Sequence, residues 1–156
     1  MENIIKININ KKEDYINKYN NKNLSKDLSN YIINEYKTFN IKNKFHIEIT
    51  SNYKMEEEEK EKLISMIRAN FGTEISEIKE YRNKTNTINT IILIIGIILL
   101  ILYEVSLNLT ILSEFILVFS WILIWESLYN FIFGTFINKI DIKRRKNLTN
   151  CKIIFK

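Results

Sequence analysis

Hydrophobic and polar residues alternate at every second position in three short parts of the chain. Residues 3–9 carry isoleucine at alternate positions from Ile5 to Ile9. Residues 45–50 follow the same pattern, and residues 151–156 alternate again. Alternation with a period of two is typical of strands that bury one face. The pattern therefore predicts a strand near each end of the chain and one between them.

Apolar residues recur with helical spacing in two further segments. Residues 24–39 and 55–70 carry them at intervals of three and four, and the second segment opens with glutamates that suit the positive end of a helix dipole. We expect a helix in each segment, with Gly72 ending the second, and residues 13–19 could add a shorter helix. Residues 73–81 fit a strand or a helix, and their pattern slightly favours a strand. Together these segments predict a small α+β domain with three or four strands and two main helices.

Two long apolar runs follow this domain, which we assign to residues 1–84. Residues 86–104 contain no charge before their last position, and residues 115–136 are interrupted only by Glu126. About 20 helical residues cross the roughly 30 Å hydrocarbon core of a bilayer, so each run is long enough to span it. Two buried helices of a soluble protein would need a much larger surrounding domain. The runs therefore predict a two-span helical hairpin within residues 85–137.

Charge is distributed unevenly along the chain. Residues 1–87 carry 16 basic and 14 acidic side chains, residues 88–137 carry three acids and no base, and residues 138–156 carry seven bases and one acid. Basic residues thus flank the predicted hairpin on one side, while the connection at 104–114 has none. By the positive-inside rule, this asymmetry predicts a cell-membrane protein with both termini in the cytoplasm.

The tail at residues 138–156 begins with a basic cluster and ends with the predicted strand at 151–156. Because both termini are expected on the same side of the membrane, this strand is able to join the N-terminal sheet. The residues that we expect at the membrane surface are Lys143, Arg144, Arg145 and Lys146.

Small residues form a stripe along the second apolar run. They recur at seven-residue spacing, which places them on one face of a helix where a neighbouring backbone can approach closely, and Gly96 of the first run is a counterpart. The stripe fits packing within one hairpin and packing between protomers equally well. Its members are Ser113, Ser120, Ser127 and Gly134.

Glu126 is the second feature of this run. An ionised carboxylate in the middle of a bilayer is costly unless it is paired, and neither run contains a base. Ser120, Ser127, Asn130 or the same glutamate of another copy are candidate partners. Three roles remain open: packing in an oligomer, an ion or proton path, and an interfacial position if the second helix begins near residue 109.

Composition argues against several classes of site. Cys151 and His46 are the only residues of their types, so no Cys/His metal site of the usual ligand count can be built. The three glycines are isolated and form no phosphate-binding loop. The mixed charges of the N-terminal domain argue against nucleic acid as a partner. No nucleophile or acid–base constellation stands out, so we expect neither an enzymatic activity nor a cofactor.

In layout, the chain resembles small bacterial membrane proteins in which a cytosolic module is joined to a two-helix hairpin, some of which are membrane-disrupting defence effectors. The sequence favours a membrane-anchored sensor or interaction module that self-associates through its hairpin. The alternative is an oligomeric channel or membrane-disrupting effector, gated by the cytosolic domain and lined by Ser120, Glu126, Ser127 and Asn130. The expected partners are the lipid bilayer, further copies of the chain or another membrane protein, and a cytosolic protein or small ligand.

Overall fold

The computed structural model describes residues 3–105 and 110–156 as a mixed helix and strand structure. The chain divides into two compact units. Unit 1 combines Met1–Glu77 with Asp141–Lys156, and unit 2 is Ile78–Ile140. The small sheet and the two long apolar helices expected from the sequence are both present.

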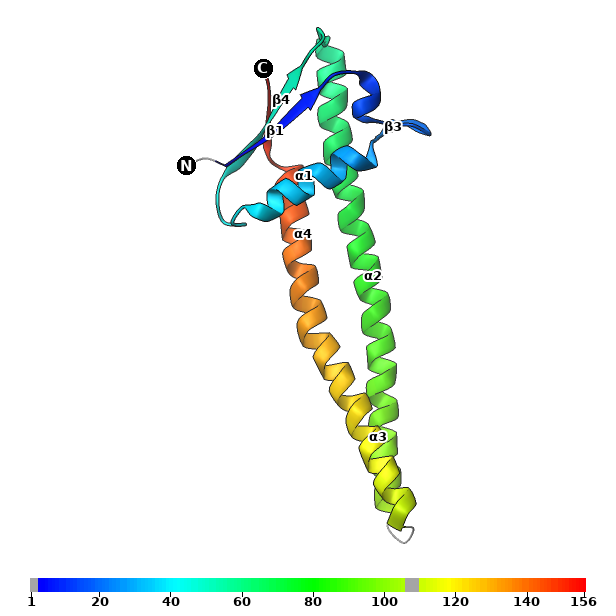
Figure 1. The fold of residues 1–156 in the computed structure, drawn as a ribbon. Helices are drawn as coiled ribbons and strands as arrows, with labels where there is room; N and C mark the ends of the chain where they lie inside the picture. Colours follow the sequence, from blue (N-terminus) through cyan, green and yellow to red (C-terminus); the bar gives the residue numbers. More distant parts are fainter. Residues whose placement is uncertain (1–2, 106–109) are drawn as a thin grey trace. The chain divides into compact units, whose positions relative to one another are not determined.

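Unit 1 is built on a three-stranded sheet in the order β1-β4-β5, in which all strands are parallel. β1 is Asn3–Ile9, β4 is Phe45–Ser51 and β5 is Lys152–Phe155. Ile5 lies opposite Ile47, and Ile47 lies opposite Ile153. The three predicted strands are confirmed, and the last residues of the chain form an edge strand beside β4 (Figure 1).

Between β1 and the first long helix, the chain makes tight turns instead of the helix considered at residues 13–19, and that prediction was wrong. Asp14 closes the first turn by accepting hydrogen bonds from the backbone of Asn10 and Lys11. Asn17 and Asn20 accept from the backbone two residues ahead, which competes with helix formation. The segment contains the 3-10 helix η1 (Lys12–Asp14) and the antiparallel strands β2 (Ile16–Asn17) and β3 (Asn20–Leu24).

Helix α1, Lys26–Thr38, confirms the predicted helix at 24–39. Ser25 caps its N-terminus, where the side-chain oxygen accepts a hydrogen bond from the Leu28 backbone amide. Its apolar residues face the sheet and are buried: Leu28, Ile32, Ile33 and Tyr36.

Helix α2 is far longer than predicted and runs from Glu57 to Val105. The helix predicted at 55–70 is confirmed, but Gly72 does not end it and residues 73–81 are helical, so the slight preference for a strand there was wrong. Gly72 has no positive φ angle and therefore provides no left-handed stop. A glycine inside a helix costs only about 1 kcal/mol relative to alanine. The segment that follows Gly72 is rich in glutamate, which favours helix, so α2 continues past the glycine.

The remaining chain is almost continuously helical. α3 is Thr110–Tyr129, a π-helical turn η2 covers Asn130–Gly134, and α4 is Thr135–Thr149. The second apolar run is therefore helical from five residues before its predicted start at residue 115. Residues 106–109, part of the predicted connection, lie outside the described residues. Two helices are long and apolar enough to cross a membrane, and only 11% and 17% of their most apolar windows are buried.

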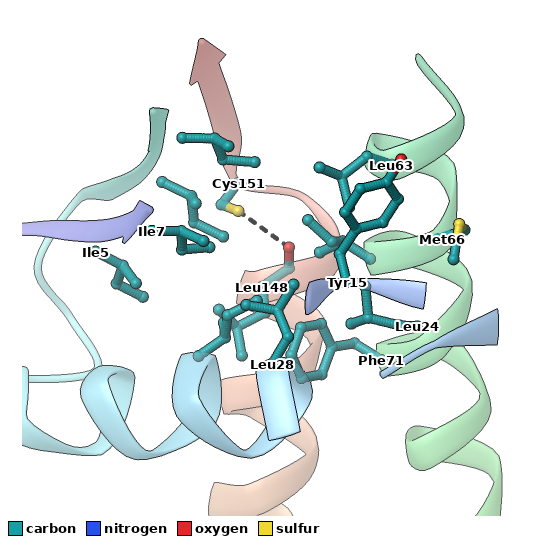
Figure 2. Close-up of a cluster of buried hydrophobic side chains, with 14 of the residues drawn as sticks. Ile5, Ile7, Tyr15, Leu24, Leu28, Leu63, Met66, Phe71, Leu148 and Cys151 are labelled. Atoms are coloured by element: carbon teal, nitrogen blue, oxygen red, sulfur yellow. Dashed lines mark hydrogen bonds between the residues drawn. The ribbon is translucent and has the colours of Figure 1, made fainter. Parts of the chain in front are cut away.

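The core of unit 1 lies between the sheet and three helices. Figure 2 shows side chains from β1, α1 and α2 meeting Leu148 and Cys151 from the C-terminal part of the chain. Leu148, in the last turn of α4, is fully buried. The Cys151 thiol donates to the Leu148 carbonyl at 3.1 Å, and burial raises the pKa of this thiol to about 11. The C-terminal residues are thus part of the core and not an appended tail.

We expect Leu148→Ala to destabilise the full-length protein by about 2–5 kcal/mol, because it empties a buried site at the centre of this core. Lys146→Ala, an exposed position on the same helix, should change stability by less than about 0.5 kcal/mol. Thermal unfolding in a mild detergent, followed by circular dichroism, measures both. Equal melting temperatures for the two variants would contradict this account of the core.

Candidate functional site

Unit 2 is held together by close packing at Gly96. A Cβ atom added to this glycine would lie 2.8 Å from Ile124 Cγ1 and 3.3 Å from both the Ile124 nitrogen and Leu123 Cβ. Real Cβ atoms essentially never approach another heavy atom within 3.0 Å. Glycine therefore allows α2 and α3 to approach here, as small residues do between helices in lipid.

The serines of the stripe lie on the same inner face of α3. Ser113, Ser120 and Ser127 are buried, with Ser120 and Ser127 at 0% exposure. Ser120 donates its hydroxyl hydrogen to the Leu117 carbonyl on its own helix. Gly134 differs from them, because a Cβ added there would meet nothing within 4 Å. The π-helical turn that ends at Gly134 shifts the residue phase after Ser127, so the stripe ends before it.

The interior of unit 2 contains buried polar groups that lack a partner among the described residues. Asn89 is 4% exposed, and its side-chain nitrogen has no hydrogen-bond partner among the described residues. The hydroxyl of Ser127 is buried and unpartnered in the same way. Buried polar atoms that lack a partner cost free energy, most of all where water is excluded. The packing between these helices is therefore tight at Gly96 but weak in its polar contacts.

Glu126 lies on the outer side of α3. Its side chain is exposed, and Asn130 donates a hydrogen bond to its Oε1 at 3.0 Å. Because Ile124 contacts Gly96, Glu126 lies about 3 Å further along the helix axis than the middle of the first apolar run. The carboxylate is therefore level with the apolar centre of α2 and far from its ends. Exposed large apolar side chains surround it at Ile122, Trp125 and Tyr129.

A polar network connects the three helices of unit 1. Glu74 of α2 accepts hydrogen bonds from Ser29 of α1 and from Asn70, each at 2.8 Å. Its other oxygen pairs with Arg145 of α4 at 2.6 Å. The Arg145 and Glu74 side chains are only 18% and 25% exposed, which limits screening by solvent. This Glu74 network therefore fixes both long helices to α1 at one point.

A second cluster centres on Glu59, near the start of α2. Tyr15 and Tyr53 donate hydrogen bonds to its Oε1 at 2.6 and 2.9 Å, and Lys12 lies 3.3 Å from the same atom. Burial opposes ionisation of Glu59, but these donors outweigh it and hold the pKa of the carboxyl below its usual value. Burial and the bond to Glu59 raise the pKa of Tyr15 above its usual value. All groups of the cluster are satisfied, so it acts as a structural clamp.

An open cavity of about 680 Å³ lies at the amino ends of β4 and β5. One wall is the loop from α1 to β4, with Lys42 and Lys44, and the other is the end of α4, with Lys143. Lys152 of β5 completes the basic lining. The volume falls within the range of small-molecule sites.

The basic residues predicted at a membrane surface have different environments. Lys143 lines this cavity and Lys146 is exposed. Arg144 has a long contact of 3.9 Å with Asp141, whereas Arg145 belongs to the Glu74 network. The four basic residues, which were predicted to act together at a membrane surface, therefore have different contacts in the structure.

Several residues of these sites were not anticipated from the sequence. Glu74 lies in the segment for which a strand was favoured, so its helical neighbours could not be recognised. Lys42, Lys44 and Lys152 are ordinary members of a lysine-rich chain, and only the fold brings them together. No sequence signal distinguishes them from the other lysines.

No protein-family model, curated protein sequence or solved structure matches this chain. Its function has to be inferred from its own residues.

Replacing Gly96 should separate the two long helices of unit 2. Gly96→Ala is expected to lower the melting temperature in detergent, because the new Cβ would lie 2.8 Å from Ile124 Cγ1 and 3.3 Å from the Ile124 nitrogen of α3. Gly134→Ala and Gly72→Ala should not lower the melting temperature, since no atom lies within 4 Å of their added Cβ. The gain in helix propensity should raise the free energy of unfolding by up to about 1 kcal/mol. A gain of the same size at Gly96 would refute the close approach.

A double-mutant cycle on Arg145 and Glu74, with alanine at each position, should give a coupling energy of about 1–2 kcal/mol in the free energy of unfolding. The matched control is the pair Arg144 and Asp141, whose 3.9 Å contact should give less than about 0.5 kcal/mol. Chemical unfolding of the full-length protein in detergent supplies the values. If the two cycles agree, the Glu74 network has no special role in joining the helices.

Proposed function

We propose that this chain is an integral membrane protein in which unit 1 is a cytosolic sensor or interaction module and the α2–α3 hairpin both anchors it and mediates self-association. The observation that supports membrane insertion is the exposure of large apolar side chains along both long helices. A core helix of a soluble protein would be mostly buried, whereas these windows are 11% and 17% buried. Lipid is the environment that removes such surfaces from water.

The charges on either side of the apolar runs support the orientation. Lysine and arginine precede the first run and follow the second, and the intervening connection has neither. Under the positive-inside rule, the β-sheet of unit 1 lies in the cytosol. The side chains that follow the second run, including Arg145, are then available to bond with cytosolic partners such as Glu74.

The Glu126–Asn130 pair supports self-association. A carboxylate and an amide on the outer face of a helix, level with the apolar centre of its neighbour, are costly when lipid surrounds them. Contact with the same face of a second copy covers both groups and allows hydrogen bonds between copies. The serine stripe is less suited to this contact, because Ser120 and Ser127 are already buried against α2.

The Glu74 network and the cavity support a sensing role. Lys143 belongs to α4 and lines the cavity, while the neighbouring Arg145 ties the same helix to α1 and α2. A ligand that shifts the end of α4 at the cavity therefore shifts a helix that begins within the second apolar segment.

The alternative is a channel or membrane-disrupting effector, and the exposed carboxylate of Glu126 is the observation that favours it. Of the four residues expected to line a pore, Ser120 and Ser127 face the inside of the helix pair while Glu126 faces outward. A pore lined by all four needs rearrangement of that pair. Ion flux in liposomes that is lost in Glu126→Gln would establish the alternative, and its absence at every protein density would exclude it.

Self-association is tested with two differently tagged full-length copies expressed in one membrane. We expect the chain to resist carbonate extraction and the tags to co-purify after cross-linking. Glu126→Leu should reduce co-purification at least fivefold, since the polar pair between copies is lost. Glu114→Leu, which removes an exposed acid elsewhere on α3, is the matched control and should have no effect.

Two results would count against the proposal. Release of the chain by carbonate would show that it does not span the membrane. An unchanged yield with Glu126→Leu, or an equal loss with Glu114→Leu, would show that the outer face of Glu126 is not the contact between copies.

A further inference from the structure

The cavity at the amino ends of β4 and β5 has a strongly one-sided charge. Lys42, Lys44, Lys143 and Lys152 line it, and none of them pairs with a carboxylate within residues 3–105 and 110–156. No aspartate or glutamate is among its lining residues in the described chain. Four ammonium groups around one cavity repel each other and favour an anion between them.

Helix dipoles do not account for this many lysines. α1 and α4 both end beside the cavity, at Thr38 and Thr149. Each helix C-terminus carries about half a negative elementary charge, so the two together offset about one lysine. About three positive charges remain without compensation. The lysines therefore exceed what stabilisation of the helix ends requires.

The walls of the cavity are fixed before any ligand binds. The side chain of Asn147, on α4, donates to the Tyr36 hydroxyl at 2.8 Å and to the Ile41 carbonyl at 3.3 Å. The adjacent loop is closed by Asn40, whose side chain accepts from the Lys42 backbone and whose carbonyl accepts from the Asn43 backbone. The loop with Lys42 and Lys44 is thus tied to the helix with Lys143. Such preorganisation lowers the entropic cost of binding.

Two further cavities of unit 1 provide a contrast. One has a volume of about 410 Å³, lies around Tyr15 and Tyr53, and balances its lysines with Glu56, Glu58 and Glu59. The other, of about 420 Å³, has three lysines in its lining together with Glu13. Both of these cavities contain a carboxylate in their lining, whereas the first does not.

We propose that the cavity between Lys42, Lys44, Lys143 and Lys152 binds a phosphate group. Phosphate is compact, carries up to two negative charges and accepts hydrogen bonds in several directions, which suits a cavity lined by several exposed lysines. The phosphate belongs to a small soluble anion or to a lipid headgroup, and the chemistry of recognition is the same. The inference rests on the proposed sensor role, for which it supplies the ligand. Binding joins α4 to the α1–β4 loop and so acts on the helix that enters the second apolar segment.

The test measures protection of individual lysines from amine acetylation, read by mass spectrometry on the full-length chain. In a maltoside detergent, which has no phosphate, inorganic pyrophosphate is added to one sample and equimolar sodium chloride to the other. A third sample is placed in nanodiscs of phosphatidylcholine and phosphatidylglycerol without pyrophosphate. We expect at least fivefold slower acetylation of Lys143 and Lys152 in one of these phosphate-containing samples, and no change at Lys26, which is exposed outside the cavity.

A charge-matched pair of variants checks that the cavity is responsible. Lys143→Gln with Lys152→Gln should weaken pyrophosphate binding, measured by calorimetry in detergent, at least tenfold if the soluble anion is the ligand. In nanodiscs, the same double variant should abolish protection of Lys42 and Lys44 if the headgroup is the ligand. Lys11→Gln with Lys26→Gln removes the same charge from exposed positions outside the cavity and should change either readout less than twofold.

Protection with pyrophosphate but not in nanodiscs assigns the site to a soluble anion, and protection in nanodiscs, with or without protection by pyrophosphate, assigns it to a headgroup. No protection in either sample, or an equal loss in both double variants, overturns the inference. These outcomes are separate from the test of self-association. A chain that cross-links in membranes but shows no protection lacks only the phosphate site, whereas one that binds pyrophosphate but is released by carbonate disproves the membrane role alone.

Discussion

The pairing of β5 with β4 is the constraint on which the rest of unit 1 depends. Neighbouring parallel strands cannot be joined by a tight turn and need a long crossover connection. Here the connection runs from Ser51 to Lys152 and contains both long apolar helices. The apolar helices are therefore an insertion within one crossover, not an appendage at the end of a finished domain. The sheet is complete only when the chain returns from the second helix, and the core closes around Leu148 at that return.

Two kinds of interaction hold the return in place, and they differ in what they specify. Apolar packing around Leu148 stabilises the core but does little to fix the orientation of the helices, because the hydrophobic effect is non-directional. The Glu74 network supplies direction, because a carboxylate with three fixed donors tolerates little displacement of Arg145, Asn70 or Ser29. Among the described residues, buried polar atoms without a partner occur in both units, on Asn89 and Ser127 in unit 2 and on Arg144 and Arg145 in unit 1.

Much of the fold follows from local pattern, while most of the candidate site does not. Strands β1, β4 and β5 and the starts of α1 and α2 were predictable because period-two and helical spacing are properties of consecutive residues. The continuation of α2 through Gly72 was missed, because a single glycine is a weak stop when the residues after it favour helix. The Gly96 contact was identified as a small-residue counterpart, but its partners Ile124 and Leu123 follow from helix register, which spacing alone does not give. The lysine-lined cavity brings together two segments that are about a hundred residues apart, 41–46 and 143–154, and no local pattern predicts that they meet.

The position of β5 after both apolar helices also determines when unit 1 can finish folding. During synthesis, the two apolar helices emerge from the ribosome before β5 does. Until β5 emerges, the edge of β4 has no neighbour on that side, and an unpaired strand edge is prone to associate with other chains. Completion of the sheet therefore reports that both apolar helices have already been made.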